Sequence, residues 1–318
     1  MNASQITAHP GDYCTVGTCS LLLAHLTYIP SLLGNLTYLT IFAIILLVQL
    51  YLGIRHKTWG YLVGMVGGLA LEIIGYAGRI QMHFNPFPFD PFLEYLICLT
   101  IGPAFIAAAI YLCLGHIVVV YGEDVSSIKP RTYSLLFVTC DFLSLVLQAV
   151  GGALAATADT RPDRAIGVNV MIAGLSTQVV SLILFMGLCA ELAWRVRRSP
   201  HLNERTAGLR SSRRWKLFLF GLAIATITIF IRCVFRVAEL QSGFKGELFN
   251  HEVTFMFLEG PMIIIASVFL TIFHPGVVCF GYEEEIHWSL RRQKQMESTH
   301  HKLGSLEHAG GADGRLGP

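Results

Sequence analysis

The ionisable side chains inside the long apolar stretches of this chain are the residues best placed to do chemistry. Arg232, Arg236 and Glu239 are spaced i, i+4 and i+7, which places them along one face of a helix. Glu252 and Glu259 share a face of the next apolar stretch in the same way. A charge near mid-bilayer costs about 2.5–3.5 kcal/mol on insertion scales, so each of these groups should face a bundle interior and find a partner.

Further polar residues of the apolar stretches are Glu72, Arg79, Glu94, Asp141, Gln148, Gln178 and Glu191. In the topology predicted below, three arginines fall in the outer half together with three glutamates, or four with Glu259. Two interpretations fit this cluster: the charges pair with one another and lock the bundle, or they form an outward-open pocket for the head group of an amphipathic ligand. Asp141 and Gln148 lie deeper on one face, where they would continue the polar path inward.

Seven apolar stretches must position these residues. Each is long enough for a helix to cross a hydrocarbon core of about 30 Å, and 53% of all residues are hydrophobic while only 14% are charged. We therefore predict an all-α, polytopic seven-helix bundle, residues 32–280, between an outer segment 1–31 and a tail 281–318 that is disordered after about 298. The predicted spans are 32–54, 60–80, 93–121, 133–157, 170–194, 216–239 and 253–273.

The distribution of Lys and Arg predicts the orientation. Seventeen basic residues fall on one side of the predicted spans and three on the other. Basic loops stay cytoplasmic, so the N-terminus is expected outside and the C-terminus inside. The first twenty residues lack the basic start and apolar core of a signal peptide, so the first span is expected to direct insertion.

The predicted outer side carries two kinds of modification signal. Asn2 and Asn35 stand in Asn-x-Ser/Thr sequons and are candidate glycosylation sites, although Asn35 is close to the first span. Cys14 and Cys19 would be able to form a local disulfide in an oxidising compartment. The other cysteines show no metal-ligand spacing, and we predict neither a metal nor a cofactor.

Small residues and one proline indicate how the helices pack. Gly60, Gly64 and Gly68 recur every four residues in the second span and favour close helix contact. Gly102 and Pro103 lie in the middle of the third span, where the proline should free a backbone carbonyl and kink the helix. We interpret this pair as a static kink or a hinge.

Five ordered motifs within residues 30–280 resemble fungal RTA-like proteins, the lipid-translocating exporter family. They are Glu72-Ile73-Ile74-Gly75-Tyr76-Ala77-Gly78-Arg79, the segment from Gly102-Pro103 to Tyr111, Cys140-Asp141-Phe142 with Gln148 to Gly152, Arg232 to Glu239 with His251-Glu252, and His274-Pro275-Gly276. In one departure, Gly102 precedes Pro103 where the family more often has Ala. The resemblance implies a seven-span protein of the fungal plasma membrane or an internal membrane such as the vacuolar one. It also implies that membrane lipids, sphingoid bases among them, or lipid-like toxic compounds are moved or exported, with resistance as the outcome.

Other classes of function fit the sequence less well. A seven-span sensor that regulates lipid asymmetry without transport stays open, although the third span ends in Val120-Tyr121-Gly122 without an Asp-Arg-Tyr element. A zinc-dependent lipid hydrolase would need His residues at one depth, and His116 and His251 are expected at opposite ends. The chain has no Gly-Lys-Ser/Thr nucleotide loop, so we expect no ATP-driven pumping by this chain alone. We expect no nucleic-acid partner and a protein that is not an enzyme.

Overall fold

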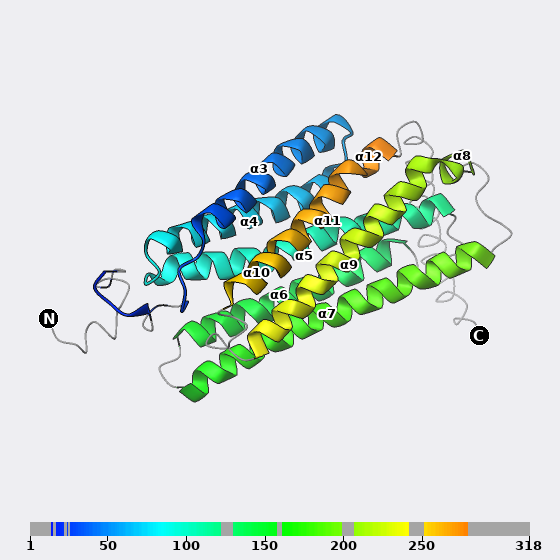
Figure 1. The fold of residues 1–318 in the computed structure, drawn as a ribbon. Helices are drawn as coiled ribbons and strands as arrows, with labels where there is room; N and C mark the ends of the chain where they lie inside the picture. The colour runs from blue at the N-terminus through cyan, green and yellow to red at the C-terminus, as the bar shows by residue number, and fades with distance from the viewer. Residues whose placement is uncertain are drawn as a thin grey trace, which may run out of the picture.

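Ten helices make up the described part of the chain in the computed structural model (Figure 1). The structure describes residues 14, 17–21, 24, 26–121, 130–157, 161–198, 207–241 and 251–278. The predictions for Asn2 and for the tail after residue 280 lie outside these residues. The helices are α3 (Leu32–Arg55), α4 (Trp59–Phe84), α5 (Phe89–Tyr121), α6 (Pro130–Thr157), α7 (Arg161–Arg198), α8 (Ala207–Ser211), α9 (Arg213–Gln241), α10 (Glu252–Leu258), α11 (Gly260–Ile272) and α12 (Pro275–Val278).

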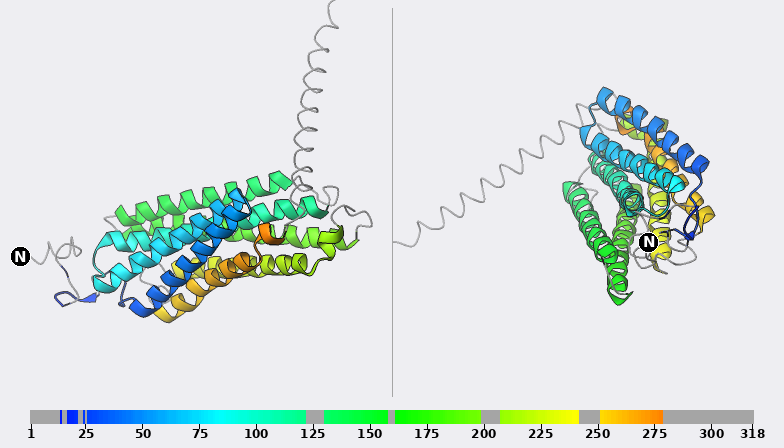
Figure 2. Two further views of the ribbon diagram at one scale, coloured as in Figure 1. Left: turned by 90° about the horizontal axis from the view of Figure 1, so that it is seen from above. Right: turned by 90° about the vertical axis from the view of Figure 1, so that its left-hand side faces the viewer.

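Seven segments of the described chain are long and apolar enough to cross a membrane: α3, α4, α5, α6, α7, α9 and the combined segment Glu252–Val278. This confirms the predicted all-α, seven-span fold. The helices run side by side, with the described N-terminal residues at one end of the bundle and α12 at the other (Figures 1 and 2). The largest difference at a boundary is in α7, which begins at Arg161 and not near residue 170.

Glycines hold neighbouring helices together at backbone contact. A Cβ atom on Gly68 of α4 would lie 2.8 Å from the carbonyl oxygen of Gly102 in α5. A Cβ atom added to Gly167 of α7 would lie 2.4 Å from the backbone nitrogen of Ala155 in α6. Close approach of this kind replaces the hydrophobic driving force that helices lack inside lipid. The α4–α5 contact is the one that positions the candidate site.

The outside of the bundle is apolar and its interior holds the charges. Leu47, Val63 and Leu135 are exposed by 67%, 66% and 69%. By contrast, Glu72, Arg79, Asp141, Arg232, Arg236, Glu239 and Glu259 are all buried. A bilayer accepts the apolar outer surface, and a polar interior is where intramembrane charges have to lie.

The last span is not the single helix that we predicted over residues 253–273. It breaks at Glu259, which ends α10 and precedes the Gly260-Pro261 start of α11. Proline has no N–H and its ring clashes with the carbonyl four residues earlier, so Pro261 cannot continue the preceding turn. The break carries the Glu259 carboxylate to the centre of the charged interior.

Candidate functional site

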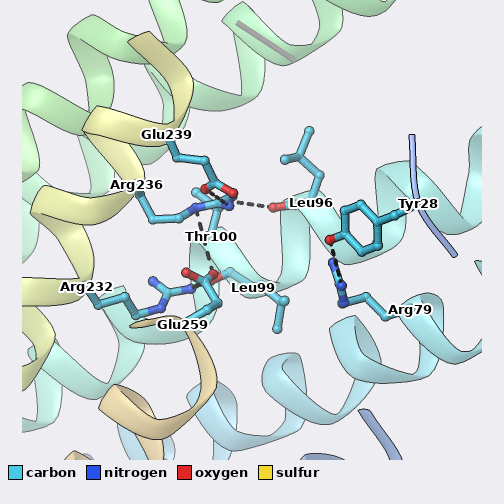
Figure 3. Close-up of polar contacts among 9 residues, drawn as sticks. All are labelled: Tyr28, Arg79, Leu96, Leu99, Thr100, Arg232, Arg236, Glu239 and Glu259. Atoms are coloured by element: carbon cyan, nitrogen blue, oxygen red, sulfur yellow. Dashed lines mark hydrogen bonds and ion pairs between the residues drawn. The ribbon is translucent and has the colours of Figure 1, made fainter. Parts of the chain in front are cut away.

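Two ion pairs at the face of α9 form the centre of the buried charges (Figure 3). Nη2 of Arg232 lies 2.6 Å from Oε1 of Glu259, and Nη1 of Arg236 lies 2.6 Å from Oε2 of Glu239. Nε of Arg236 is 3.8 Å from the same Glu259 oxygen, so the two pairs are linked. The i, i+4, i+7 spacing predicted this shared face. We call Arg232, Arg236, Glu239 and Glu259 the ion-pair cluster.

The ion-pair cluster is anchored to α5 beside Pro103. Proline at position 103 donates no backbone hydrogen bond, so the Leu99 carbonyl loses its helical partner. Arg232 donates to that carbonyl through Nη2. Arg236 donates to the Thr100 hydroxyl at 3.0 Å, and this hydroxyl donates to the Leu96 carbonyl at 2.6 Å (Figure 3). The sequence predicted the freed carbonyl, and the structure identifies the guanidinium that occupies it.

Arg79 of α4 is held by neutral groups. Its Nε donates to Oδ1 of Asn35 at 3.0 Å and its Nη2 to the Tyr28 hydroxyl at 3.1 Å. The guanidinium carbon lies 3.9 Å from the ring centroid of Phe255 and 5.3 Å from that of Tyr95, which are cation–π distances. Within the described chain this buried arginine makes no ion pair with a carboxylate.

Glu72 is the buried acidic counterpart. Its side chain is 1% exposed, and neither carboxylate oxygen has a hydrogen-bond partner within the described chain. A Cβ atom on Gly102 would lie 2.9 Å from Oε1 of Glu72, so the carboxylate rests against α5 one residue before Pro103. A buried polar group without a partner is costly, which makes this carboxylate a position that a ligand can satisfy.

A second polar set lies among α5, α6 and α7. The Tyr111 hydroxyl donates to Oδ2 of Asp141 at 2.8 Å, while Oδ1 of Asp141 has no hydrogen-bond partner within the described residues. Nε2 of Gln148 donates to the Ser144 hydroxyl at 2.9 Å and to Oε1 of Gln178 at 3.4 Å. Asp141 and Gln148 therefore share the α6 face that their spacing predicted.

The structure corrects three expectations about the site. Glu252 is half-buried at the start of α10, where it accepts from the Ser31 backbone at 2.5 Å, and Glu94 is half-buried as well, so neither joins the ion-pair cluster. The cluster is also not open to the outside, because its side chains are buried.

The third correction concerns glycosylation at Asn35. This residue is 0% exposed within α3, and its amide nitrogen donates to the Ser31 carbonyl at 2.6 Å. An acceptor amide has to be accessible, so a glycan at Asn35 does not fit this fold. Cys14 and Cys19 are joined in a disulfide with Cα atoms 5.4 Å apart.

The sequence analysis missed the neutral partners of the charges. Tyr28, Asn35 and Tyr111 carry no charge, so the spacing of charged residues gives no sign of them. The glycosylation sequon drew attention to Asn35 for a different reason. Within the described residues no group of three His, Cys, Asp or Glu side chains is placed to hold a metal ion.

The buried charges leave a formal excess of acid. Four buried carboxylates, Glu72, Asp141, Glu239 and Glu259, stand against three buried guanidinium groups among the described residues. Two carboxylates are used in the ion-pair cluster, whereas Glu72 and Asp141 have no basic partner within 4 Å in the described chain.

Fold and site together define a polytopic helical membrane protein with a charged interior. The chain belongs to the RTA1-like family: residues 65–282 match the family model described as RTA1 like protein. This confirms the resemblance that the five motifs indicated.

Similar proteins come from the yeast Saccharomyces cerevisiae. The chain is 36% identical to the sphingoid long-chain base transporter RSB1 over 287 residues, which cover 81% of this chain and 75% of the relative. It is 29% identical to protein RTM1, with 68% of each chain covered, and 29% identical to protoporphyrin uptake protein 1, with 64% and 65% covered. No solved structure matches the chain significantly.

Proposed function

We propose that this chain moves single-chain amphipathic lipids with a cationic amine, sphingoid bases in particular, across its membrane without catalysing a reaction. The observation that carries the proposal is the Glu72 carboxylate, buried and without a hydrogen bond within the described chain. The name of the 36% identical relative, a sphingoid long-chain base transporter, supports the same class of ligand.

The chemistry of the head group fits this carboxylate. An ammonium group offers three N–H donors and no acceptor. A hydrogen bond to a charged partner stabilises by about 1.5–3 kcal/mol, more than a neutral one. The neighbouring Arg232 and Arg236 are already engaged by Glu259 and Glu239, so they do not compete for Glu72 at ion-pair distance. The alkyl chain would lie between helices, where the surroundings are apolar.

Access to Glu72 requires movement, because the carboxylate is covered. Gly102 lies directly against it, one residue before Pro103, where α5 lacks one helical hydrogen bond. A hinge at this point would separate the two halves of α5 and expose the carboxylate. In the predicted orientation the cluster lies in the outer half, which favours export and resistance to toxic amphiphiles. The plasma membrane is the expected location, with the vacuolar membrane as the alternative.

Efflux from proteoliposomes tests the proposal. The purified chain is reconstituted alone, and release of labelled sphinganine is compared between the unaltered chain, Glu72→Gln and the matched control Glu252→Gln. Glu72→Gln should slow efflux by about tenfold or more, corresponding to one charge-assisted hydrogen bond of about 1.5–3 kcal/mol. Glu252→Gln changes a half-buried carboxylate at the start of α10 and should leave the rate unchanged.

Two outcomes would overturn the proposal. Equal efflux from the Glu72→Gln protein and the unaltered chain would show that the carboxylate takes no part in moving the lipid. A folded, unaltered chain that binds sphinganine and releases none would favour a membrane sensor of lipid composition. Melting temperature in detergent is measured for each variant, since loss of fold in Glu72→Gln alone would assign the carboxylate a structural role.

A further inference from the structure

A separate groove opens between α5, α7 and α9, away from the ion-pair cluster. Its volume is about 690 Å³, within the roughly 300–1,000 Å³ of small-ligand pockets. Apolar side chains line most of it, among them Leu114 of α5, Phe185 of α7 and Leu219 of α9. Its lining extends along α7 from Phe185 to Arg197, which is about 18 Å at 1.5 Å per residue.

The length of the groove suits an alkyl chain. About 18 Å along a helix is comparable to one leaflet, since the whole hydrocarbon core is about 30 Å thick. Phe185 lines the end of the groove farthest from Arg197 along α7, and its ring packs against Tyr111 at 4.7 Å between centroids. No residue of the ion-pair cluster lines the groove, so the two sites are separate.

Two basic side chains stand at the other end of the groove. Arg197 of α7 and Lys216 of α9 are both exposed and both line it. Neither makes an ion pair within the described chain, while two arginines near Arg197 are occupied. Arg195 lies 2.7 Å from Glu191, and Arg198 lies 4.2 Å from the ring centroid of Trp194.

The positive charge at this end of the groove favours an anionic head group, whereas Glu72 suits a cationic one. Arginine binds phosphate oxygens through two parallel N–H donors, and lysine adds a point charge. A phosphate monoester carries about −1.5 to −2 charges near neutral pH, which matches two cations. Tyr121 lines the same end of the groove. Its hydroxyl accepts a hydrogen bond from Nε1 of Trp215 at 3.2 Å, which holds the Tyr121 ring in place.

We propose that the groove between α5, α7 and α9 binds a single-chain lipid with a phosphate monoester head group. The alkyl chain lies along Leu114, Leu219 and Ala223, and the phosphate lies between Arg197 and Lys216. Phosphorylated sphingoid bases and lysophosphatidic acid share this chemistry. The site goes beyond the amine site at Glu72, because it takes an anion and lies at the end of the bundle that the basic loops predict to be cytoplasmic.

A cysteine of the groove provides the test. Cys189 of α7 lines the groove and is half-buried, and Cys140 of α6 is half-buried but does not line it. Alkylation of both thiols by a maleimide is followed by peptide mass spectrometry on the full chain in uncharged detergent. Sphinganine 1-phosphate and lysophosphatidic acid should each slow alkylation of Cys189 by about tenfold and leave that of Cys140 unchanged. Sphinganine and two-chain phosphatidic acid should give little protection.

Substitution of the basic pair then assigns the head group. The double variant Arg197→Gln, Lys216→Gln should raise the concentration of sphinganine 1-phosphate that half-protects Cys189 by tenfold or more. The control Arg198→Gln removes a charge one residue away and should change nothing. Equal protection by all four lipids, no protection by either phosphate lipid, or protection that survives the double substitution would overturn the proposal. Glu72→Gln should leave Cys189 protection unaltered, so this result is independent of the proposed efflux.

Discussion

At the scale of single residues, both arginines of the ion-pair cluster are held by more than an ionic partner. Arg232 binds Glu259 and the Leu99 carbonyl, and Arg236 binds Glu239 and the Thr100 hydroxyl. Taking two charges out of water is repaid only when the pair has good geometry and its other donors are satisfied. The carbonyl freed by Pro103 supplies part of this compensation. A proline that weakens α5 thus helps to hold an arginine in the membrane.

Glu259 should be the residue whose neutralisation costs most in this cluster. Glu259→Gln removes the charge opposite Arg232 and leaves a buried guanidinium without its counterion. Breaking a buried pair in this way costs about 3–5 kcal/mol of stability. The melting temperature of the purified protein in detergent should fall by several degrees. The control Glu252→Gln, at a half-buried carboxylate that meets a backbone N–H, should have a much smaller effect, and equal melting temperatures would contradict the pairing.

At the scale of helices, contact between α4 and α5 sets the geometry of the site. A Cβ on Gly68 would lie 2.6 Å from Cγ1 of Ile106 and 2.8 Å from the Gly102 carbonyl oxygen, and backbone cannot move aside as a side chain can. Gly68→Ala should therefore lower stability by about 1–3 kcal/mol, the usual cost of overpacking. Gly187→Ala in α7 is the matched control, because nothing lies within 4 Å of its added Cβ. Equal melting temperatures of the two variants would contradict the close backbone contact between α4 and α5.

A second prediction for α5 concerns the replacement of Pro103. Pro103→Ala restores an N–H that can bond to the Leu99 carbonyl, which stiffens the helix beside Glu72. Sphinganine efflux should slow several-fold. The melting temperature should be unchanged or raised, because the Leu99 carbonyl has two lone pairs and can accept from the restored N–H while it keeps its bond to Arg232. Pro91→Ala is the control, since Pro91 lies in the first turn of α5, where its missing N–H breaks no helical hydrogen bond. An unaltered efflux rate in Pro103→Ala would show that α5 does not bend here during transport.

The sequence predicted the helices better than the contacts between them. Seven apolar stretches and the spacing of Arg232, Arg236 and Glu239 are periodic signals, and both appear in the structure. The break at Glu259 was missed because residues 253–273 are apolar enough to hide the Gly260-Pro261 signal. The neutral partners of Arg79 were missed because they come from elements far along the chain, and which neutral group a charge meets depends on tertiary packing.

At the scale of the whole molecule, orientation in the membrane decides whether the amine site faces outward and the groove inward. The basic loops predict an outer N-terminus. Asn2 should then carry a glycan, whereas buried Asn35 should not, because its amide is bonded inside α3. Glycosidase treatment of the chain expressed in yeast should give one mobility shift that Asn2→Gln abolishes and Asn35→Gln leaves intact. An acceptor sequon added after Pro318 should stay unmodified, and a glycan at that added site would reverse the orientation of both proposed sites.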